Sequence, residues 1–252
     1  MSNGASCGDA SSTCQSVALA EDDSRQVHSN TGQTICIYDN MKFETPNQIE
    51  NQNINEEEYS ERRRLEILEQ SKLEAGKKLD LALLILKRKQ AAQLGNYDVI
   101  EPDKHKEQIA QEFQKEFFAI EELLKELGVS YRANPLHEDR GIYGFSFLVA
   151  EKEENLEKVI EAGKSRDDKT FGALMGYPKT AVDAYNTEQA FDYEEELPKD
   201  ELEQLRQDGV LPFINFMPSR EHWKEELNYA KENQKLIKER IPLLYAELVP
   251  KT

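Results

Sequence analysis

The residues best suited to chemistry stand at the predicted start of the last long helix, where Ser219 is followed by Arg220 and His222. Serine is a favourable helix N-cap, and the backbone N–H groups that follow an N-cap suit an anion. Arg220 adds a forked donor, and His222 carries an imidazole that titrates near neutral pH. These three residues predict an anion-binding helix start.

A glycine-proline corner supplies the second half of this predicted site. Gly176, Tyr177 and Pro178 separate two short predicted helices, and Lys179 follows directly. If the corner meets Ser219, an aromatic face, a hydroxyl and three cationic or titratable groups can converge on one acidic small molecule. The plainer alternative is that Ser219 only caps its helix, Tyr177 packs in the core and the charges are solvated.

A charged run, residues 137–140 (HEDR), offers a second kind of chemistry. His137, Glu138 and Asp139 could bind a metal or transfer protons, but the run falls in a predicted hairpin turn, where charged side chains are usually solvated. The sequence lacks the signatures of phosphate-binding loops, dinucleotide folds, nucleophile elbows and HExxH zinc sites. We therefore predict neither a metal site nor a cofactor, and leave open whether the chain is an enzyme.

All three cysteines, Cys7, Cys14 and Cys36, precede the predicted folded region. An odd number of cysteines without a secretory signal argues against a disulfide framework. Three thiolates could bind a metal, but structural zinc sites use two closely spaced pairs of ligands. The spacing favours unpaired, reduced thiols.

Residues 171–185 (FGALMGYPKTAVDAY) have the outline of a helix-turn-helix. Its second helix would present Lys179, Thr180 and Asp183 to DNA, which is a poor set because base and phosphate contacts rely on Arg, Lys, Asn and Gln. DNA binding therefore stays an alternative, and two packed helices around the corner are the simpler interpretation.

Several short blocks resemble an uncharacterised prokaryotic family, domain of unknown function 483. They are residues 141–144 (GIYG), 171–178 (FGALMGYP) with Val182 and Tyr185, 211–215 (LPFIN) and 218–219 (PS), and the resemblance covers residues 129–240. The family's pattern has a Cys-Cys pair where this chain has Thr180 and Ala181, and a further cysteine where it has Ser219. If those cysteines form a metal or redox site, the resemblance implies that this chain has lost it. The resemblance implies no activity.

The chain is strongly acidic, with 32 Lys and Arg against 49 Asp and Glu and a formal net charge of −17. Such a field repels nucleic acids and anionic lipids. The longest apolar run, residues 81–86 (LALLIL), is far shorter than the roughly 20 residues of a membrane span. The start of the chain also lacks the apolar stretch of a secretory signal. We predict a cytoplasmic protein that contacts no membrane and does not favour nucleic acid as a partner.

Residues 1–56 predict a disordered tail, because they are rich in Ser, Asn, Gly, Thr and Gln and show no sustained apolar period. Within the tail, residues 33–40 (QTICIYDN) could form a short pairing strand. The character of the chain changes after Met41, which is a plausible internal start. Residues 57–252 are expected to form a single domain.

Two long helices are predicted at the start of this domain. The first covers residues 57–94, ends at Gly95 and carries an apolar stripe that would suit a protein partner, although core packing is the simpler interpretation. The second covers residues 102–127, ends at Gly128 and has the clearest amphipathic stripe in the chain.

The remainder predicts a hairpin followed by short helices. Residues 129–150 are rich in aromatic and β-branched residues around a polar turn, and Gly144 marks a close backbone approach or a bulge. Helices are expected at 155–162, on both sides of the corner, at 198–207 and from Ser219 onward, with an extended segment at 210–217. The predicted fold class is α+β, mostly helical with a small antiparallel sheet.

Three classes of function remain open. The missing motifs favour a non-catalytic binding or protein-interaction protein. The alternatives are an enzyme or small-anion-binding protein that uses Tyr177, Lys179, Ser219, Arg220 and His222, and a DNA-binding protein that uses residues 171–185.

Overall fold

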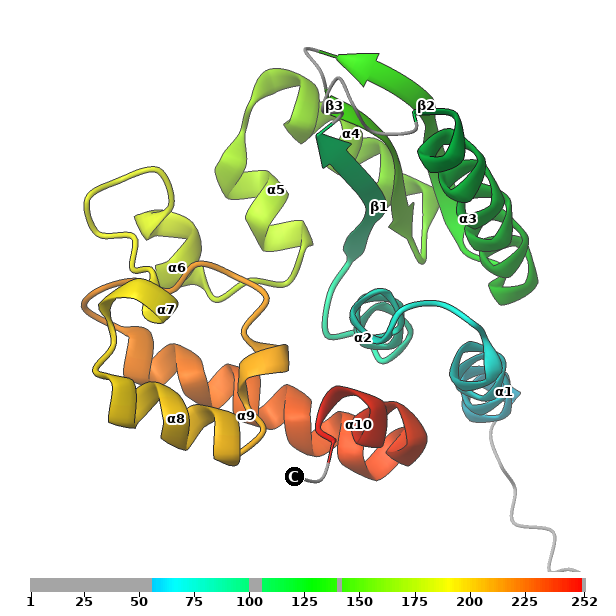
Figure 1. The fold of residues 1–252 in the computed structure, drawn as a ribbon. Coiled ribbons are helices and arrows are strands. Elements are labelled where there is room, and N and C mark those ends of the chain that lie inside the picture. The colour runs from blue at the N-terminus through cyan, green and yellow to red at the C-terminus, as the bar shows by residue number, and fades with distance from the viewer. Residues whose placement is uncertain (1–55, 100–105, 140–141, 251–252) are drawn as a thin grey trace, which may run out of the picture. The chain divides into compact units, whose positions relative to one another are not determined.

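The computed structural model describes residues 56–99, 106–139 and 142–250, all within the unit Gln52–Thr252. Figure 1 shows a small sheet with helices around it and a series of short helices after the last strand. The elements are α1 (Glu56–Gln70), α2 (Ala75–Ile85), β1 (Ala91–Val99), α3 (Lys106–Leu127), β2 (Ser130–Asp139), β3 (Ile142–Ala150), α4 (Glu153–Ser165), α5 (Asp168–Leu174), α6 (Lys179–Ala184), α7 (Tyr193–Glu196), α8 (Lys199–Gln207), the 3-10 turn η1 (Leu211–Phe213), α9 (Trp223–Arg240) and α10 (Pro242–Leu248). The predicted α+β class, mostly helical with a small antiparallel sheet, is confirmed. The predictions for the tail, its cysteines and residues 33–40 lie outside the described residues.

The sheet has the strand order β1-β3-β2, and both pairings are antiparallel. The predicted hairpin is confirmed, since β2 pairs with β3. Its register shifts between Asn134 and His137, where Pro135 has no N–H to donate to the ladder. Gly144 lies where β3 meets β1, and a Cβ there would be 2.5 Å from the carbonyl oxygen of Asn96. The close approach predicted at Gly144 is therefore confirmed.

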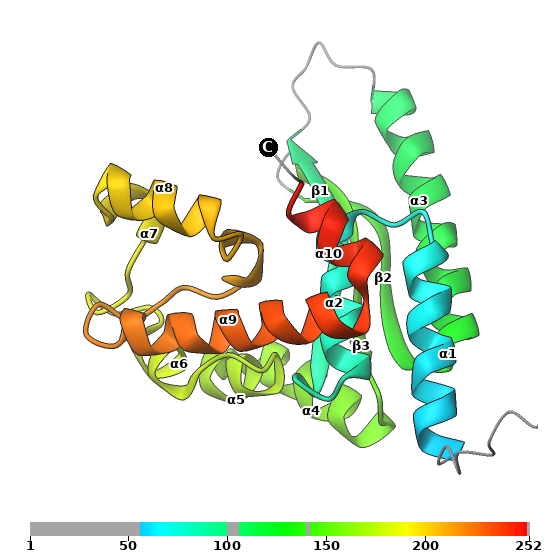
Figure 2. The same ribbon diagram turned by 90° about the horizontal axis from the view of Figure 1, so that it is seen from below.

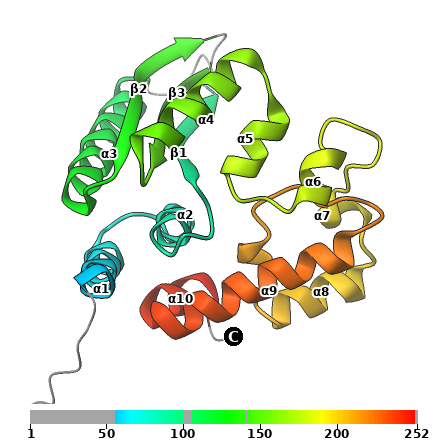
Figure 3. The ribbon, with the colours of Figure 1, turned by 180° about the vertical axis from the view of Figure 1, so that it is seen from behind.

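The two faces of β3 pack against different helices, as Figures 1 and 3 show. Side chains alternate along a strand, so Phe145 and Phe147 point to α3 while Ala150 points to α4. The ring of Phe117 on α3 lies 4.7 Å from the ring of Phe147 and 5.6 Å from the ring of Phe145, centroid to centroid. The predicted stripe of α3 is thus part of the core. Gly128 ends α3 with a positive φ of 66°, as predicted.

The prediction of one helix over residues 57–94 is wrong, because this stretch forms α1, α2 and β1. Lys87 adopts a left-handed backbone and ends the second helix. Ala91 to Leu94 have helical propensity, but pairing with β3 overrides it. Gly95 serves this pairing rather than a helix end, since a Cβ there would lie 2.4 Å from the carbonyl oxygen of Phe145.

The apolar stripe that suggested a protein partner is occupied inside the chain. Leu65 and Leu68 of α1 and Leu79 and Ala82 of α2 are buried in the main core. Figure 2 shows α1 alongside α3, and α9 leading to α10, which lies against α2. A partner on this stripe would have to displace these contacts.

Three further predictions for the second half need correction. α4 continues past Gly163 to Ser165 and ends at Arg166, which has a left-handed backbone. Residues 210–217 are not extended, because η1 occupies Leu211–Phe213 around Pro212. α9 begins at Trp223 rather than Ser219. The expected restart at Pro242 and the helices on both sides of the glycine-proline corner are confirmed. None of the described helices is long and apolar enough to cross a membrane.

Candidate functional site

The glycine-proline corner between α5 and α6 packs directly on the turn before β1. Gly176 has a φ of 76°, and a Cβ there would lie 2.6 Å from the carbonyl oxygen of Arg88 and 2.9 Å from Cβ of Lys89. Gln90 also donates its N–H to the carbonyl of Leu174 at 2.9 Å. Only glycine permits both this backbone conformation and this approach. The corner therefore holds the next residue, Tyr177, in a fixed place.

Tyr177 is partly buried, and its ring centre lies 6.2 Å from that of Phe216. Burial raises the pKa of its hydroxyl to about 12, and the negative charge of Asp80 adds to the shift. Asp80 is in turn paired with the ammonium of Lys89, whose side chain is only 4% exposed. Because burying a lysine is tolerated when it is paired, this ion pair explains how Lys89 can lie under the corner. Tyr177 thus presents a neutral phenol.

A cavity of about 650 Å³ opens beside this corner. Its walls come from the end of α4, α5, α6, residues 191–194 and residues 214–218. Six aromatic side chains line it: Phe171, Tyr177, Tyr185, Phe191, Tyr193 and Phe216. α5 packs closely against α6 at Gly172, where a Cβ would lie 2.9 Å from Cγ2 of Val182. The absence of a side chain at Gly172 permits this approach.

Charged and polar groups also line the cavity. They are Arg166, Asp168, Asp192, Glu194 and Asn215. The Asp168 carboxylate accepts a hydrogen bond of 2.7 Å from Asn186, and Asp192 accepts the N–H groups of Glu194 and Glu195 as the N-cap of α7. The lining therefore combines aromatic side chains with three carboxylates and one guanidinium.

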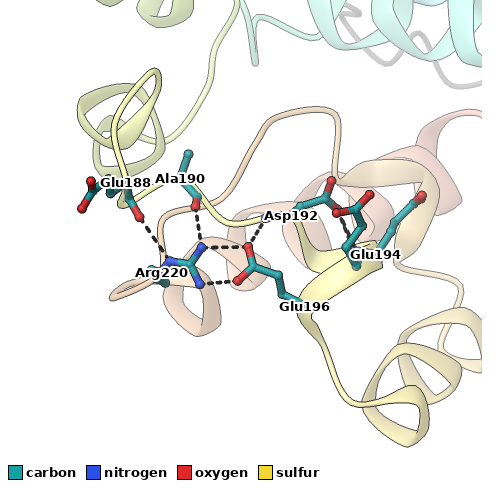
Figure 4. A network of polar contacts seen from close by, with 7 residues as sticks. Glu188, Ala190, Asp192, Glu194, Glu196 and Arg220 are labelled. Atoms are coloured by element: carbon teal, nitrogen blue, oxygen red, sulfur yellow. Dashed lines mark hydrogen bonds and ion pairs between the residues drawn. The ribbon is translucent and has the colours of Figure 1, made fainter.

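Residues 190–196, which contain the cavity wall at residues 191–194, are tied to the turn before α9 by Arg220, as Figure 4 shows. The guanidinium forms a two-pronged ion pair with Glu196, with one N···O distance of 2.8 Å. It also donates to the carbonyl oxygens of Glu188 at 3.2 Å and Ala190 at 3.3 Å. This pairing lowers the pKa of the Glu196 carboxyl and raises the pKa of Arg220. The forked donor predicted to bind an external anion is thus occupied by a carboxylate of the chain itself.

Ser219 does not cap α9, because His222 occupies the N-cap position before Trp223. The backbone of Ser219 pairs instead with Ala190 in an isolated antiparallel bridge. Its hydroxyl accepts the N–H of His222 at 3.1 Å and donates to Glu226 at 2.9 Å. The expected helix N-terminus is therefore a turn that is already hydrogen-bonded.

Glu226, which no sequence motif singled out, is a buried carboxylate that links α6 to α9. It accepts hydrogen bonds from the hydroxyl of Thr180 at 2.5 Å, the hydroxyl of Ser219 and the backbone N–H of Ser219 at 2.7 Å. Only 3% of Glu226 is exposed. Its position in the apolar stripe of α9 was the signal that could have identified it. The buried members of that stripe are Glu226, Leu227, Ala230, Asn233 and Ile237.

The five predicted site residues do not converge on one space. Tyr177 lines the cavity, while Lys179 is exposed on α6. Ser219 and Arg220 make the internal contacts given above, and His222 lies beside the carboxylates of neighbouring glutamates, with its Nδ1 3.6 Å from the nearer one. α6, which follows the corner, does meet the start of α9, but through the contact of Thr180 with Glu226 rather than an open anion site. A bound anion stays a prediction.

His137 of the charged run and two residues of the predicted helix-turn-helix make contacts within the chain. His137 belongs to β2 rather than to a turn, and its Nδ1 lies 3.0 Å from the carbonyl oxygen of Pro135. In the predicted helix-turn-helix, Asp183 pairs with Lys169 at 3.2 Å, and Thr180 is turned to Glu226. Over the described ranges, no three His, Cys, Asp or Glu side chains are grouped so that they could hold a metal ion.

A second hollow, of about 690 Å³, lies between α1 and the end of α9. It is lined mainly by charged side chains, and some of them already pair, as Arg62 does with Glu66 at 3.2 Å. The aromatic cavity is therefore the better candidate for a ligand site.

Comparison of the chain with known protein families, with curated proteins and with solved structures found no match. The resemblance to domain of unknown function 483 therefore stays a prediction. Thr180 and Ser219, two positions that this predicted resemblance would match to cysteines, both donate to Glu226.

Proposed function

We propose that the chain is a binding protein that holds a small organic molecule in the aromatic cavity. The observation that carries this proposal is an opening of about 650 Å³ with six aromatic side chains and a few polar groups. Small-molecule sites in proteins typically have about 300–1,000 Å³, mainly apolar walls and a small number of polar groups that orient the ligand.

The walls are held by contacts that need no ligand. Gly176 locks the corner, Glu226 joins α6 to the turn before α9, and Arg220 ties residues 190–196 to the same turn. A site that is already formed loses less conformational entropy when a ligand binds. These tethers therefore support a preformed binding cavity.

The chemistry of the lining favours binding over group transfer. Among the described residues that form the cavity there is no Ser, Thr, Cys, His or Lys. Asp192 is committed to capping α7, and the phenol of Tyr177 stays protonated. Aromatic packing with a few polar contacts is the interaction that this lining supports best.

A thermal-shift screen with small aromatic compounds of all charge types tests the proposal. A ligand at a concentration of 100 times its Kd should stabilise the chain by about 2.7 kcal/mol and raise the melting temperature by several degrees. Gly163→Phe should abolish this shift, because Gly163 lines the cavity and its Cβ would lie 3.9 Å from the ring of Phe171.

Gly76→Phe is the matched control, since Gly76 is also an exposed helical glycine with no atom within 4 Å of its Cβ position, and it does not line the cavity. This variant should keep the shift. The proposal is wrong if no compound stabilises the wild-type chain, or if Gly163→Phe binds the same compounds with unchanged affinity.

A further inference from the structure

The charge of the cavity lining is uneven. Three carboxylates, those of Asp168, Asp192 and Glu194, face a single cation, Arg166, so the lining has a formal charge of −2. Arg220 does not balance it, because its guanidinium is paired with Glu196 and it does not line the cavity. The net charge of the whole chain, −17, has the same sign.

The aromatic walls add a second attraction for positive charge. A cation within about 6 Å of an aromatic ring centre is attracted by the negative face of the ring. One wall residue already makes this contact from outside the cavity, because the guanidinium carbon of Arg220 lies 5.8 Å from the ring centre of Phe191. Tyr185 lines the mouth and is 48% exposed, so a ligand can reach its ring.

The phenol of Tyr193, in the cavity lining, lies in the same negative surroundings. Burial raises the pKa of Tyr193, and the carboxylates of Glu194 and Asp192 raise it further. A negative potential that opposes a phenolate also opposes the carboxylate or phosphate of a ligand. It favours an ammonium group at the same place.

We propose that the cavity selects an organic cation, in which an ammonium or methylated ammonium group is joined to an aromatic or alkyl body. The body lies against the aromatic walls, and the cationic group lies near the lining carboxylates, of which Asp168 and Glu194 do not cap a helix. This inference rests on the proposed function and adds the charge of the ligand to it.

Two compounds of nearly the same shape test the charge alone. They are [4-(hydroxymethyl)phenyl]trimethylammonium and its neutral counterpart 4-tert-butylbenzyl alcohol, with 4-tert-butylbenzoate as the anion. In isothermal titration calorimetry with the full chain, the cation should bind roughly tenfold more tightly than the alcohol. The benzoate should bind most weakly of the three. Added salt should reduce the preference for the cation, since the lining carboxylates are partly solvated.

Variants that remove carboxylates test where the preference for the cation arises. Asp168→Asn combined with Glu194→Gln should reduce the preference for the cation at least threefold and leave the affinity for the alcohol unchanged. Glu122→Gln combined with Glu126→Gln is the control, because it removes two exposed carboxylates from α3, outside the cavity. The control should keep the full preference.

The outcomes separate the two proposals. If the alcohol or the benzoate binds as tightly as the cation, the cavity binds ligands but the inference about charge is wrong. If the control pair weakens the cation as much as the cavity pair does, the preference comes from net charge and the inference is again wrong. If none of the three binds and the broader screen also fails, both proposals are wrong.

Discussion

Aromatic side chains serve two regions of this protein in opposite ways. Between α3 and the sheet, the rings of Phe113, Phe117, Phe145 and Phe147 pack against one another at centroid distances of 4.7–6.1 Å. Around the glycine-proline corner, six rings surround an opening of about 650 Å³. The sheet register brings Phe145 and Phe147 under one helix, whereas the rings at the corner stand on several short segments that polar contacts join to one another. Aromatic content alone therefore does not mark a site.

The largest effect should come from emptying the ring cluster under α3. Phe145 is fully buried, so Phe145→Ala should lower the free energy of unfolding by about 3–5 kcal/mol. Tyr185→Ala at the cavity mouth should change it by about 0.5 kcal/mol or less, because Tyr185 is half exposed. Urea denaturation measures both changes. Equal losses would show that the two regions are packed alike.

The next largest effect should come from the corner glycine. Gly176→Ala adds both a left-handed backbone strain and an overlap with the carbonyl of Arg88, so we expect a loss of about 2–5 kcal/mol in the free energy of unfolding. Gly128→Ala is the control, because Gly128 has a similar φ but open space at its Cβ position. It should lose only about 1–2 kcal/mol. A Gly176→Ala loss no larger than that of the control would mean that the corner can move away from Arg88.

Removing the buried carboxylate of Glu226 should have an intermediate effect. Glu226→Ala leaves the buried N–H of Ser219 without its acceptor, at a cost of about 1–3 kcal/mol. Glu226→Gln should cost less, because its amide oxygen can still accept one of the two hydroxyls. We expect ligand affinity at the cavity to fall in the same order, since this tether positions the wall at residues 214–218. An unchanged affinity in Glu226→Ala would show that the wall does not depend on this tether.

The smallest effect on stability should come from Glu196. Its pKa is lowered in the folded chain by Arg220, so its carboxylate stabilises the fold above the ordinary carboxyl pKa. This contribution is lost as the pH falls through the lowered value, in the range below about pH 4. Because the pair is exposed to solvent, Glu196→Gln should hardly change the melting temperature at neutral pH and should slightly flatten its decline in acid. A steeper decline in acid than in the wild-type chain would contradict this sign.

Ligand affinity should respond to Glu196→Gln more strongly than the melting temperature does. Loss of the ion pair with Arg220 should loosen residues 190–196 and weaken the binding of any ligand that uses that wall. Glu203→Gln is the control, since it removes another exposed ion pair, with Arg206, that has no part in the cavity. It should leave the affinity unchanged.

The sequence by itself was sufficient for the elements that rest on local patterns. The stripe of α3, the hairpin of β2 and β3, the corner at Gly176 and the restart at Pro242 were all readable, because helical period, strand composition and glycine or proline act over a few residues. The close approach at Gly144 followed from the same kind of signal.

The tertiary structure decided what depends on distant partners. Residues 91–94 have helical propensity, and only their pairing with residues 147–150 of β3 makes them a strand. Arg220 looked like an open anion donor until Glu196, which is 24 residues earlier, was placed beside it. Glu226 and the cavity arise in the same way, because their neighbours come from α6, the turn before α9 and segments spread over residues 162–218. Local propensity cannot report such contacts, since each one exists only after the chain has closed the loop between its partners.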